Sequence, residues 1–115
     1  MPKVDVGPIE LHYERQGNGP PLAFISGLGA SGGLWNPVVE ILRSQYDCIT
    51  FDNRGIGESS RPDNGYAISD LTRDTLGLLD RLSISASHII GMSMGGMVAQ
   101  EIALERPEMV TSLIL

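Results

Sequence analysis

Apolar residues fall in short runs along this chain, and glycine- and proline-rich turns separate them. Segments 4–6 and 9–14 alternate apolar and polar residues around Gly7-Pro8, which predicts a β-hairpin. Four nearly continuous apolar runs follow, as expected for strands buried on both faces of a parallel sheet. These runs are residues 22–25, 48–51, 88–90 and 110–115.

Three segments between these runs have helical character. The first opens at Asn36-Pro37, because proline suits the first turn of a helix. The third follows the turn at residues 91–96 and ends before Pro107; it is apolar nearly all round at first, so we expect it to be buried.

The second helix is expected to begin at Ser69-Asp70, with a capping residue and then an acid at the positive end of the helix dipole. Its leucines share one face, and its charged residues are expected to lie off that face. The leucines are Leu71, Leu78, Leu79 and Leu82, and the charged residues are Arg73, Asp74, Asp80 and Arg81. Gly77, in mid-helix, suggests a close packing contact, since glycine costs a helix about 1 kcal/mol relative to alanine.

Strands and helices alternate after the hairpin, which predicts the α/β class. We expect a mostly parallel sheet with helices on both faces and an N-terminal β-hairpin. The 115 residues fit a single domain, 1–115, without an internal repeat.

Composition narrows the function classes. The formal net charge is −6, with one lysine and no basic cluster, so we expect neither nucleic acid nor an anionic membrane as a partner. Cys48 is the only cysteine, which excludes an internal disulfide and a thiolate metal cluster. Neither histidine is spaced as a metal ligand, and no phosphate-binding loop with lysine is present. We therefore predict no cofactor and no metal, and a cytoplasmic protein.

The strongest chemical signal is Gly91-Met92-Ser93-Met94-Gly95. A serine hydroxyl is a weak nucleophile and must be exposed and oriented, which a sharp strand-to-helix turn achieves. That turn crowds the backbone, so the residues two before and two after the serine must be small. The pattern predicts Ser93 as the catalytic nucleophile.

A second glycine-rich loop, Ser26-Gly27-Leu28-Gly29, follows the strand at 22–25. An oxyanion hole needs two N–H donors about 3 Å from the developing charge. We predict that these are the backbone N–H groups of Leu28 and of Met94, the residue after the nucleophile.

These two loops and the segment Asp52-Asn53-Arg54-Gly55-Ile56-Gly57-Glu58-Ser59 resemble the α/β-hydrolase superfamily over essentially the whole chain. The similarity is to small soluble members, including enol-lactonases, haloperoxidase-like esterases and carbon–carbon bond hydrolases. It implies that Ser93 is the nucleophile and that Leu28 and Met94 are the oxyanion donors. It also implies that Asp52, Arg54 and Gly57 mainly shape a loop near the site.

Two departures from this family are visible. Ser26 stands where the family usually has histidine. More seriously, the family's acid and histidine follow the nucleophile along the chain, and no histidine follows Ser93 here. His12 and His88 read as structural residues, and His88 should point away from the site.

The sequence therefore predicts an incomplete α/β-hydrolase fold lacking the last strands, with the nucleophile and oxyanion donors but without the triad acid and histidine. The parent enzyme would cleave an ester, lactone or related acyl bond of a small-molecule acyl substrate through an acyl-Ser93 intermediate. The chain alone would be inactive. The alternative is a non-catalytic half-fold that forms a homo-oligomer through its exposed sheet edge or binds a complementing subunit.

Overall fold

The computed structural model describes residues 2–115 and contains one six-stranded sheet. Its strand order is β1-β2-β4-β3-β5-β6. The strands are β1 (Lys3–Asp5), β2 (Glu10–Gly17), β3 (Pro21–Ile25), β4 (Asp47–Phe51), β5 (Ser87–Gly91) and β6 (Val110–Ile114). The helices are α1 (Asn36–Leu42), α2 (Ile68–Arg81) and α3 (Met94–Glu105), with short 3-10 turns at Gly32–Trp35 and Pro107–Met109.

The sheet confirms the predicted α/β class. Strands β4, β3, β5 and β6 run parallel, and β2 joins them antiparallel through β4. The predicted hairpin is β1 with β2, although β2 continues past residue 14 to Gly17, because that stretch pairs with β4. The carboxyl ends of β3, β4 and β5 therefore meet at one edge of the sheet, where ligands of open α/β sheets bind.

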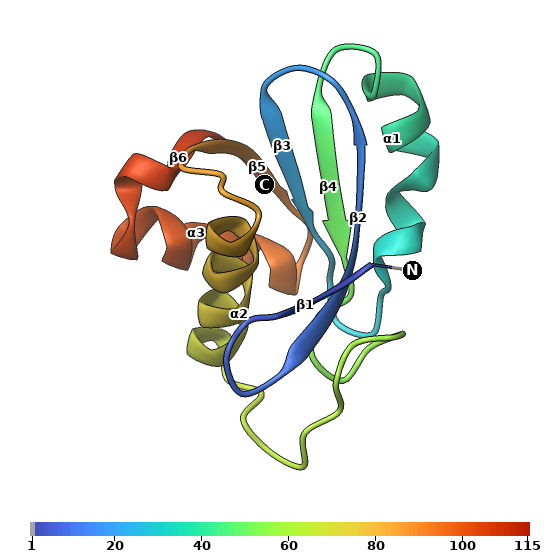
Figure 1. The fold of residues 1–115 in the computed structure, drawn as a ribbon. Coiled ribbons are helices and arrows are strands. Elements are labelled where there is room, and N and C mark those ends of the chain that lie inside the picture. The colour runs from blue at the N-terminus through green and yellow to red at the C-terminus, as the bar shows by residue number, and fades with distance from the viewer. Residues whose placement is uncertain (1) are drawn as a thin grey trace.

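Helices cover both faces of the sheet (Figure 1). Helix α1 lies on one face over a small apolar cluster that includes Phe24 and Val39. Helices α2 and α3 lie side by side on the other face, over the main core, which includes Ile25, Leu78 and Ile102. The alternation of apolar side chains along the strands supplies both clusters, since successive strand residues face opposite sides.

The start of α2 differs from the prediction. The helix begins at Ile68, not at Ser69-Asp70, and Ala67 occupies the N-cap position. The Ala67 N–H donates to Asp70 Oδ2 at 3.0 Å, so Asp70 caps the helix from its third position. The sequence predicted that Ser69 would cap the helix through its hydroxyl, but in the structure the Asp70 carboxylate accepts the free N–H of Ala67.

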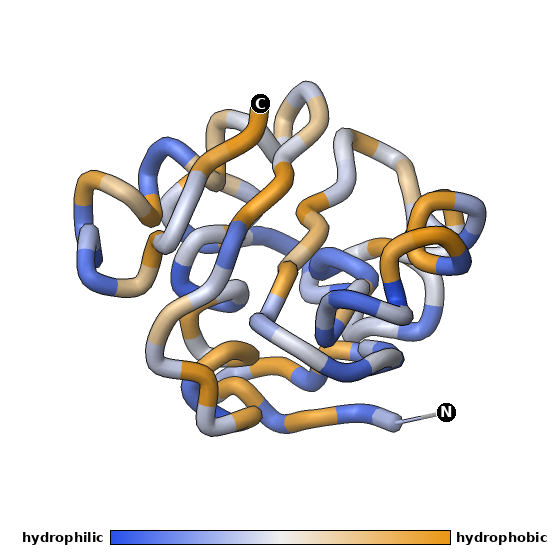
Figure 2. Tube along the Cα trace, turned by 90° about the horizontal axis from the view of Figure 1, so that it is seen from above, coloured by the Kyte–Doolittle hydropathy of each residue, from blue (hydrophilic) through white to orange (hydrophobic). Residues whose placement is uncertain are grey.

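Two predictions of burial were wrong. Asp74 was expected off the apolar face of α2, yet it is buried because it pairs with Arg54 from the loop after β4. Strand β6 was expected to be buried on both faces, yet Ile114 is 51% exposed. Among residues 2–115, β6 pairs only with β5 and forms the sheet edge, and Figure 2 shows hydrophobic residues at the C-terminal end of the chain.

Helix α3 is buried on the side that faces the sheet, as Val98, Ala99 and Ile102 show. It is not buried all round as predicted, since Met97 is 55% exposed. The apolar first turns of α3 therefore also leave one apolar side chain, Met97, exposed close to Ser93.

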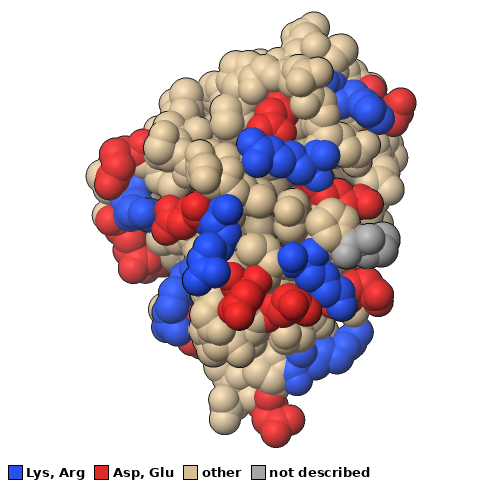
Figure 3. Space-filling model, viewed as in Figure 1, with Lys and Arg blue, Asp and Glu red and all other residues tan. Residues whose placement is uncertain are grey.

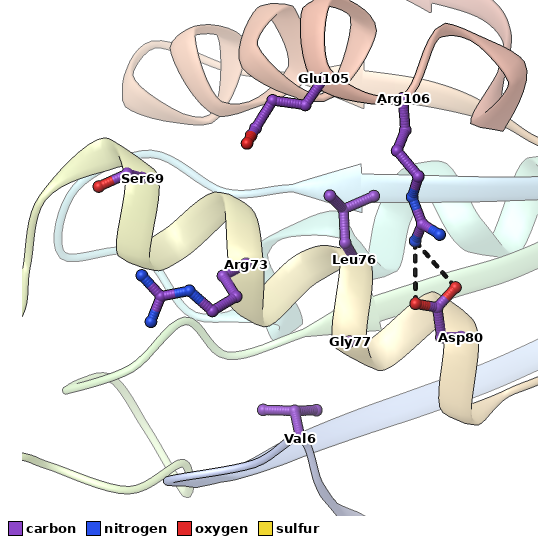
Figure 4. A pocket seen from close by; sticks show the side chains of 8 residues that line it. All are labelled: Val6, Ser69, Arg73, Leu76, Gly77, Asp80, Glu105 and Arg106. Atoms are coloured by element: carbon purple, nitrogen blue, oxygen red, sulfur yellow. Dashed lines mark hydrogen bonds and ion pairs between the residues drawn. The ribbon is translucent and has the colours of Figure 1, made fainter.

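Gly77 in α2 has the packing contact that its position suggested. A Cβ atom built there would lie 3.1 Å from Val6 Cβ, so the helix and the hairpin turn pack closely at this glycine and a larger residue would have to push Val6 aside (Figure 4). On the same helix, Asp80 accepts two hydrogen bonds from Arg106 at 2.8 and 2.9 Å, which ties α2 to the end of α3. These contacts fix α2 against its neighbours.

Charged side chains of both signs interleave over the surface shown in Figure 3, and the basic ones do not form a separate cluster there. Within residues 2–115, no helix combines the length and the apolar character that crossing a membrane requires.

Candidate active site

Ser93 lies at a sharp turn between β5 and α3. It is exposed and occupies the N-cap position of α3 with φ +56° and ψ −119°, a conformation that few residues other than glycine adopt. Two backbone hydrogen bonds hold the turn: Met92 N–H donates to Ile25 O at 3.1 Å, and Gly95 N–H donates to Met92 O at 2.9 Å. The hydroxyl is thus presented beside the carboxyl end of β3.

Gly91 and Gly95 make this turn possible. A Cβ atom on Gly91 would run into the carbonyl oxygen of Gly95, and one on Gly95 would run into the carbonyl oxygen of Ile25. Both collisions are with backbone atoms, which cannot move aside as a flexible side chain can. The spacing of the glycines around Ser93 therefore has the steric reason that the sequence pattern implied.

The Ser26–Gly29 loop lies against the same turn. A Cβ atom on Gly27 would lie 3.4 Å from Ser93 Cβ, so the two loops are in contact there. Among residues 2–115, neither the Leu28 N–H nor the Met94 N–H has a hydrogen-bond acceptor. Both residues line one cavity of about 220 Å³. Two unpaired donors next to an exposed serine are what an oxyanion hole requires.

Ser26 has its own role in this loop. Its hydroxyl accepts a hydrogen bond from Trp35 Nε1 at 2.9 Å and lies 3.4 Å from Ser31 O. The hydroxyl therefore closes the loop on itself, where the family usually has histidine. The Trp35 indole also packs on Phe24, with ring centroids 5.0 Å apart, which anchors the loop to the apolar cluster under α1.

Asp52 connects three segments of the chain at the end of β4. Its Oδ1 accepts from Gly32 N–H at 2.8 Å, and its Oδ2 accepts from Glu58 N–H at 3.0 Å. His12 Nδ1 lies 3.1 Å from Oδ2. Gly57 has φ +52°, and a Cβ atom there would run into the Asp52 carboxylate. The carboxylate thus holds the 53–60 loop and the segment after the oxyanion loop in one arrangement.

Burial alone would raise the pKa of Asp52, but the hydrogen bonds from Glu58, Gly32 and His12 outweigh it and lower the pKa below its ordinary value. A lowered pKa means that the ionised carboxylate stabilises the fold at neutral pH. This stabilisation is complete above the pKa of the unfolded chain, about 4, and is lost as the pH falls through the pKa of the folded chain.

We therefore expect the contribution of Asp52 to the free energy of unfolding to stay constant above about pH 4 and to fall below it, and expect Asp52→Asn to remove that fall. At pH 7 the variant should lose about 1–3 kcal/mol, because the amide cannot accept from both N–H groups as the carboxylate does. Urea unfolding of both proteins at neutral pH and at several pH values below about 4 measures this. An unchanged pH slope in the variant would show that Asp52 does not carry the effect.

Arg54 and Asp74 form a buried ion pair beside this loop. Arg54 Nε and Nη2 donate to the two Asp74 carboxylate oxygens at 2.6 and 2.8 Å, and Nη1 donates to Gly65 O at 2.6 Å. The two side chains are 5% and 3% exposed. The hydrogen bond with Asp74 raises the pKa of Arg54. The pair fastens both ends of the loop between β4 and α2, which agrees with the loop-shaping role expected for Arg54.

The two histidines are engaged away from Ser93. His12 lies against Asp52, and His88 Nδ1 lies 2.6 Å from Ser112 Oγ on the far side of β5. Within residues 2–115, no side chain hydrogen bonds to the Ser93 hydroxyl, and no group of three or more potential metal ligands occurs. The described residues thus place no base within hydrogen-bonding distance of the exposed Ser93 hydroxyl.

Several residues of this region were not predicted from the sequence. Trp35, Gly32 and Asp74 reach the site loops from other segments, and only the fold brings them together. Asn53 lines the cavity and is buried, with its Nδ2 3.4 Å from Ser26 O. Its position two residues after a buried strand was the one available signal, because side chains at strand ends often line sites.

Comparison with known proteins agrees with this geometry. A family model described as alpha/beta hydrolase fold matches residues 20–115. A Mycobacterium tuberculosis protein named "Putative non-heme bromoperoxidase BpoC" is 40% identical over 93% of this chain and 41% of its own length. A "Putative carbamate hydrolase RutD" from Azorhizobium caulinodans is 34% identical over 100% of this chain and 43% of its own.

Among solved structures, the enol-lactonase from Burkholderia xenovorans LB400 superposes with a TM-score of 0.93 at 33% identity. The match covers 97% of this chain and 45% of the enol-lactonase. The chain spans about two fifths of the length of the curated relatives that it matches.

Proposed function

This chain belongs to the alpha/beta hydrolase fold family, and from that premise we propose that it carries the nucleophile and oxyanion donors of a serine hydrolase. The observation that supports this most directly is Ser93 itself, exposed at a backbone turn that two glycines make possible. Ser93 Oγ attacks the carbonyl carbon of an ester, lactone or related acyl bond. The Leu28 and Met94 N–H groups stabilise the oxyanion of the tetrahedral intermediate. This intermediate collapses to acyl-Ser93 as the C–O bond breaks and the alcohol leaves with the proton taken from Ser93, and water then hydrolyses acyl-Ser93.

In this proposal the base that takes the hydroxyl proton lies outside residues 2–115, since His12 and His88 are engaged elsewhere. The chain would then be one part of a longer hydrolase, as its coverage of 41% to 45% of its relatives suggests. The relatives' names favour a small acyl or carbamoyl substrate. A cytoplasmic location stays a prediction.

Acetylation by p-nitrophenyl acetate tests the nucleophile without requiring turnover. The serine oxygen attacks the acetyl carbon, p-nitrophenolate leaves, and the hydroxyl proton passes to solvent. We expect peptide mass spectrometry to find Ser93 acetylated at least about tenfold faster than the other exposed serines, because one oxyanion donor is worth about 10²–10³ in rate. These serines are Ser44, Ser69, Ser83 and Ser85.

The four other exposed serines are internal controls, and Ser93→Ala is the matched variant for the intact-mass signal. Equal acetylation of Ser93 and the controls would contradict the proposed role.

A second, non-catalytic candidate is self-association through the sheet edge. It is favoured by β6, which carries no charged residue and is paired on one side only within residues 2–115. Charged side chains usually protect such edges from pairing with another chain. Size-exclusion chromatography with light scattering separates the two candidates, because only self-association requires a dimer.

A further inference from the structure

The cavity of about 220 Å³ beside the Ser93 turn offers more than a place for oxyanion donors. Leu28 and Met94 form its wall on the side of the serine, and the opposite wall comes from the loop after β4 and from α2. The side chains contributed by those opposite elements include Asn53, Ile56, Tyr66 and Leu71. A group bound in this cavity lies next to the Ser93 turn, because Met94 follows Ser93 directly in the chain.

The charged side chain of this cavity is already engaged, and the polar atoms left unpaired there within residues 2–115, the Leu28 and Met94 N–H groups and Asn53 Oδ1, carry no charge. Arg54 lines it, but its guanidinium is neutralised by Asp74 and bound to Gly65 O. The Tyr66 hydroxyl donates to Pro62 O at 2.6 Å, which leaves its ring facing the loop. A carboxylate or ammonium group entering the cavity would lose its hydration without gaining an ionic partner, at a large cost in free energy.

The surface next to Ser93 is apolar as well. Leu28 is 85% exposed, and Met92 and Met97, the residue before Ser93 and the residue four after it, are 45% and 55% exposed. Large exposed apolar side chains that gather around a reactive group mark a binding surface. Methionine suits such a surface because its side chain adapts to ligand shape.

We propose that this cavity binds the non-reacting part of the substrate, and that this part is an uncharged, apolar group about the size of a six-membered ring. The size follows from the volume, since a cavity of about 150 Å³ already accepts benzene. The proposal rests on the proposed function of Ser93, because it places this group next to the acyl carbon that Ser93 attacks.

Two probes of equal size and different charge test this proposal on the chain itself. Cyclohexylmethanol should bind and shift the side-chain methyl signals of Ile56, Leu71 and Met94 in carbon–proton correlation spectra. Cyclohexanecarboxylate should bind at least about tenfold more weakly, because burying an unpaired charge is unfavourable. Tighter binding of the carboxylate would overturn the proposal and assign the cavity to anions through Arg54.

A blocking variant locates the binding site. Ile56 is partly exposed on the loop, so Ile56→Trp fills the cavity from the side of the solvent and leaves the core in place. We expect it to reduce cyclohexylmethanol binding at least about tenfold while circular dichroism stays unchanged. Undiminished binding, or shifts confined to Leu22, Ile90 and Ile114 in the apolar cavity on the other face of the sheet, would refute the proposal.

The outcome is separable from that of the acetylation experiment. Neither probe carries an acyl bond that Ser93 could cleave, so probe binding reports on the cavity alone. Absence of probe binding together with selective acetylation of Ser93 would remove this inference and leave the proposed function standing. Probe binding without acetylation would remove the proposed function, and would leave an apolar binding cavity whose ligand is not a substrate of Ser93.

Discussion

Replacing Leu28 by proline should slow the acetylation of Ser93 by about 10²- to 10³-fold, to the level of the exposed serines. Proline has no backbone N–H, so the substitution deletes one of the two proposed oxyanion donors. The folded chain should tolerate it, because Leu28 is 85% exposed, its N–H has no acceptor within residues 2–115, and its φ is negative. The rate is measured by peptide mass spectrometry after timed exposure to p-nitrophenyl acetate.

The matched variant is Leu28→Ala, which removes the same side chain but keeps the N–H. The difference in rate between the two variants therefore isolates the backbone donor from the side chain. Equal rates in both would mean that the Leu28 N–H does not stabilise the transition state. Far-UV circular dichroism of both variants checks that the loop change has not unfolded the chain.

Breaking the Arg54–Asp74 pair should produce the largest loss of stability among the predictions made for this chain. Arg54→Met leaves the Asp74 carboxylate buried without a partner, which costs about 3–5 kcal/mol in the free energy of unfolding. Arg15→Met is the matched control, since Arg15 also pairs with an aspartate, Asp47, but its side chain is 40% exposed. Exposed pairs contribute only about 0–1 kcal/mol. Urea unfolding of the two variants measures the difference.

The double variant Arg54→Met/Asp74→Leu separates the charge from the packing. Because it removes both buried charges, it should recover much of the stability that Arg54→Met loses. If Arg54→Met loses no more free energy of unfolding than Arg15→Met, the ion pair does not stabilise the connection between β4 and α2.

Local sequence patterns were sufficient for the order of the elements. The apolar runs at 22–25 and 48–51 became β3 and β4, because strands covered on both faces need apolar side chains on both. The glycines around Ser93 identified its turn for a steric reason that acts within five residues. Such features depend on neighbours along the chain and can be predicted from it.

Features that depend on distant partners were predicted poorly. Asp74 is polar and was expected to be exposed, but its partner Arg54 lies 20 residues away. Strand β6 resembles the central strands in composition, and only the strand order shows that it lies at an edge. The Trp35 hydrogen bond to Ser26 likewise requires the 3-10 turn before α1 to fold back over the loop. Tertiary structure determines pairings of this kind, and they produce no periodic pattern of residues in the sequence from which they could be predicted.

The backbone conformation of Ser93 limits which nucleophiles could replace it during evolution. At φ +56° and ψ −119° Ser93 lies outside the left-handed helical region, and a positive φ is a steric outlier for residues with a branched Cβ. Threonine offers the same hydroxyl but carries such a branched Cβ. The turn therefore favours replacements with an unbranched Cβ, such as cysteine or aspartate, over threonine, although threonine is the smaller chemical step from serine.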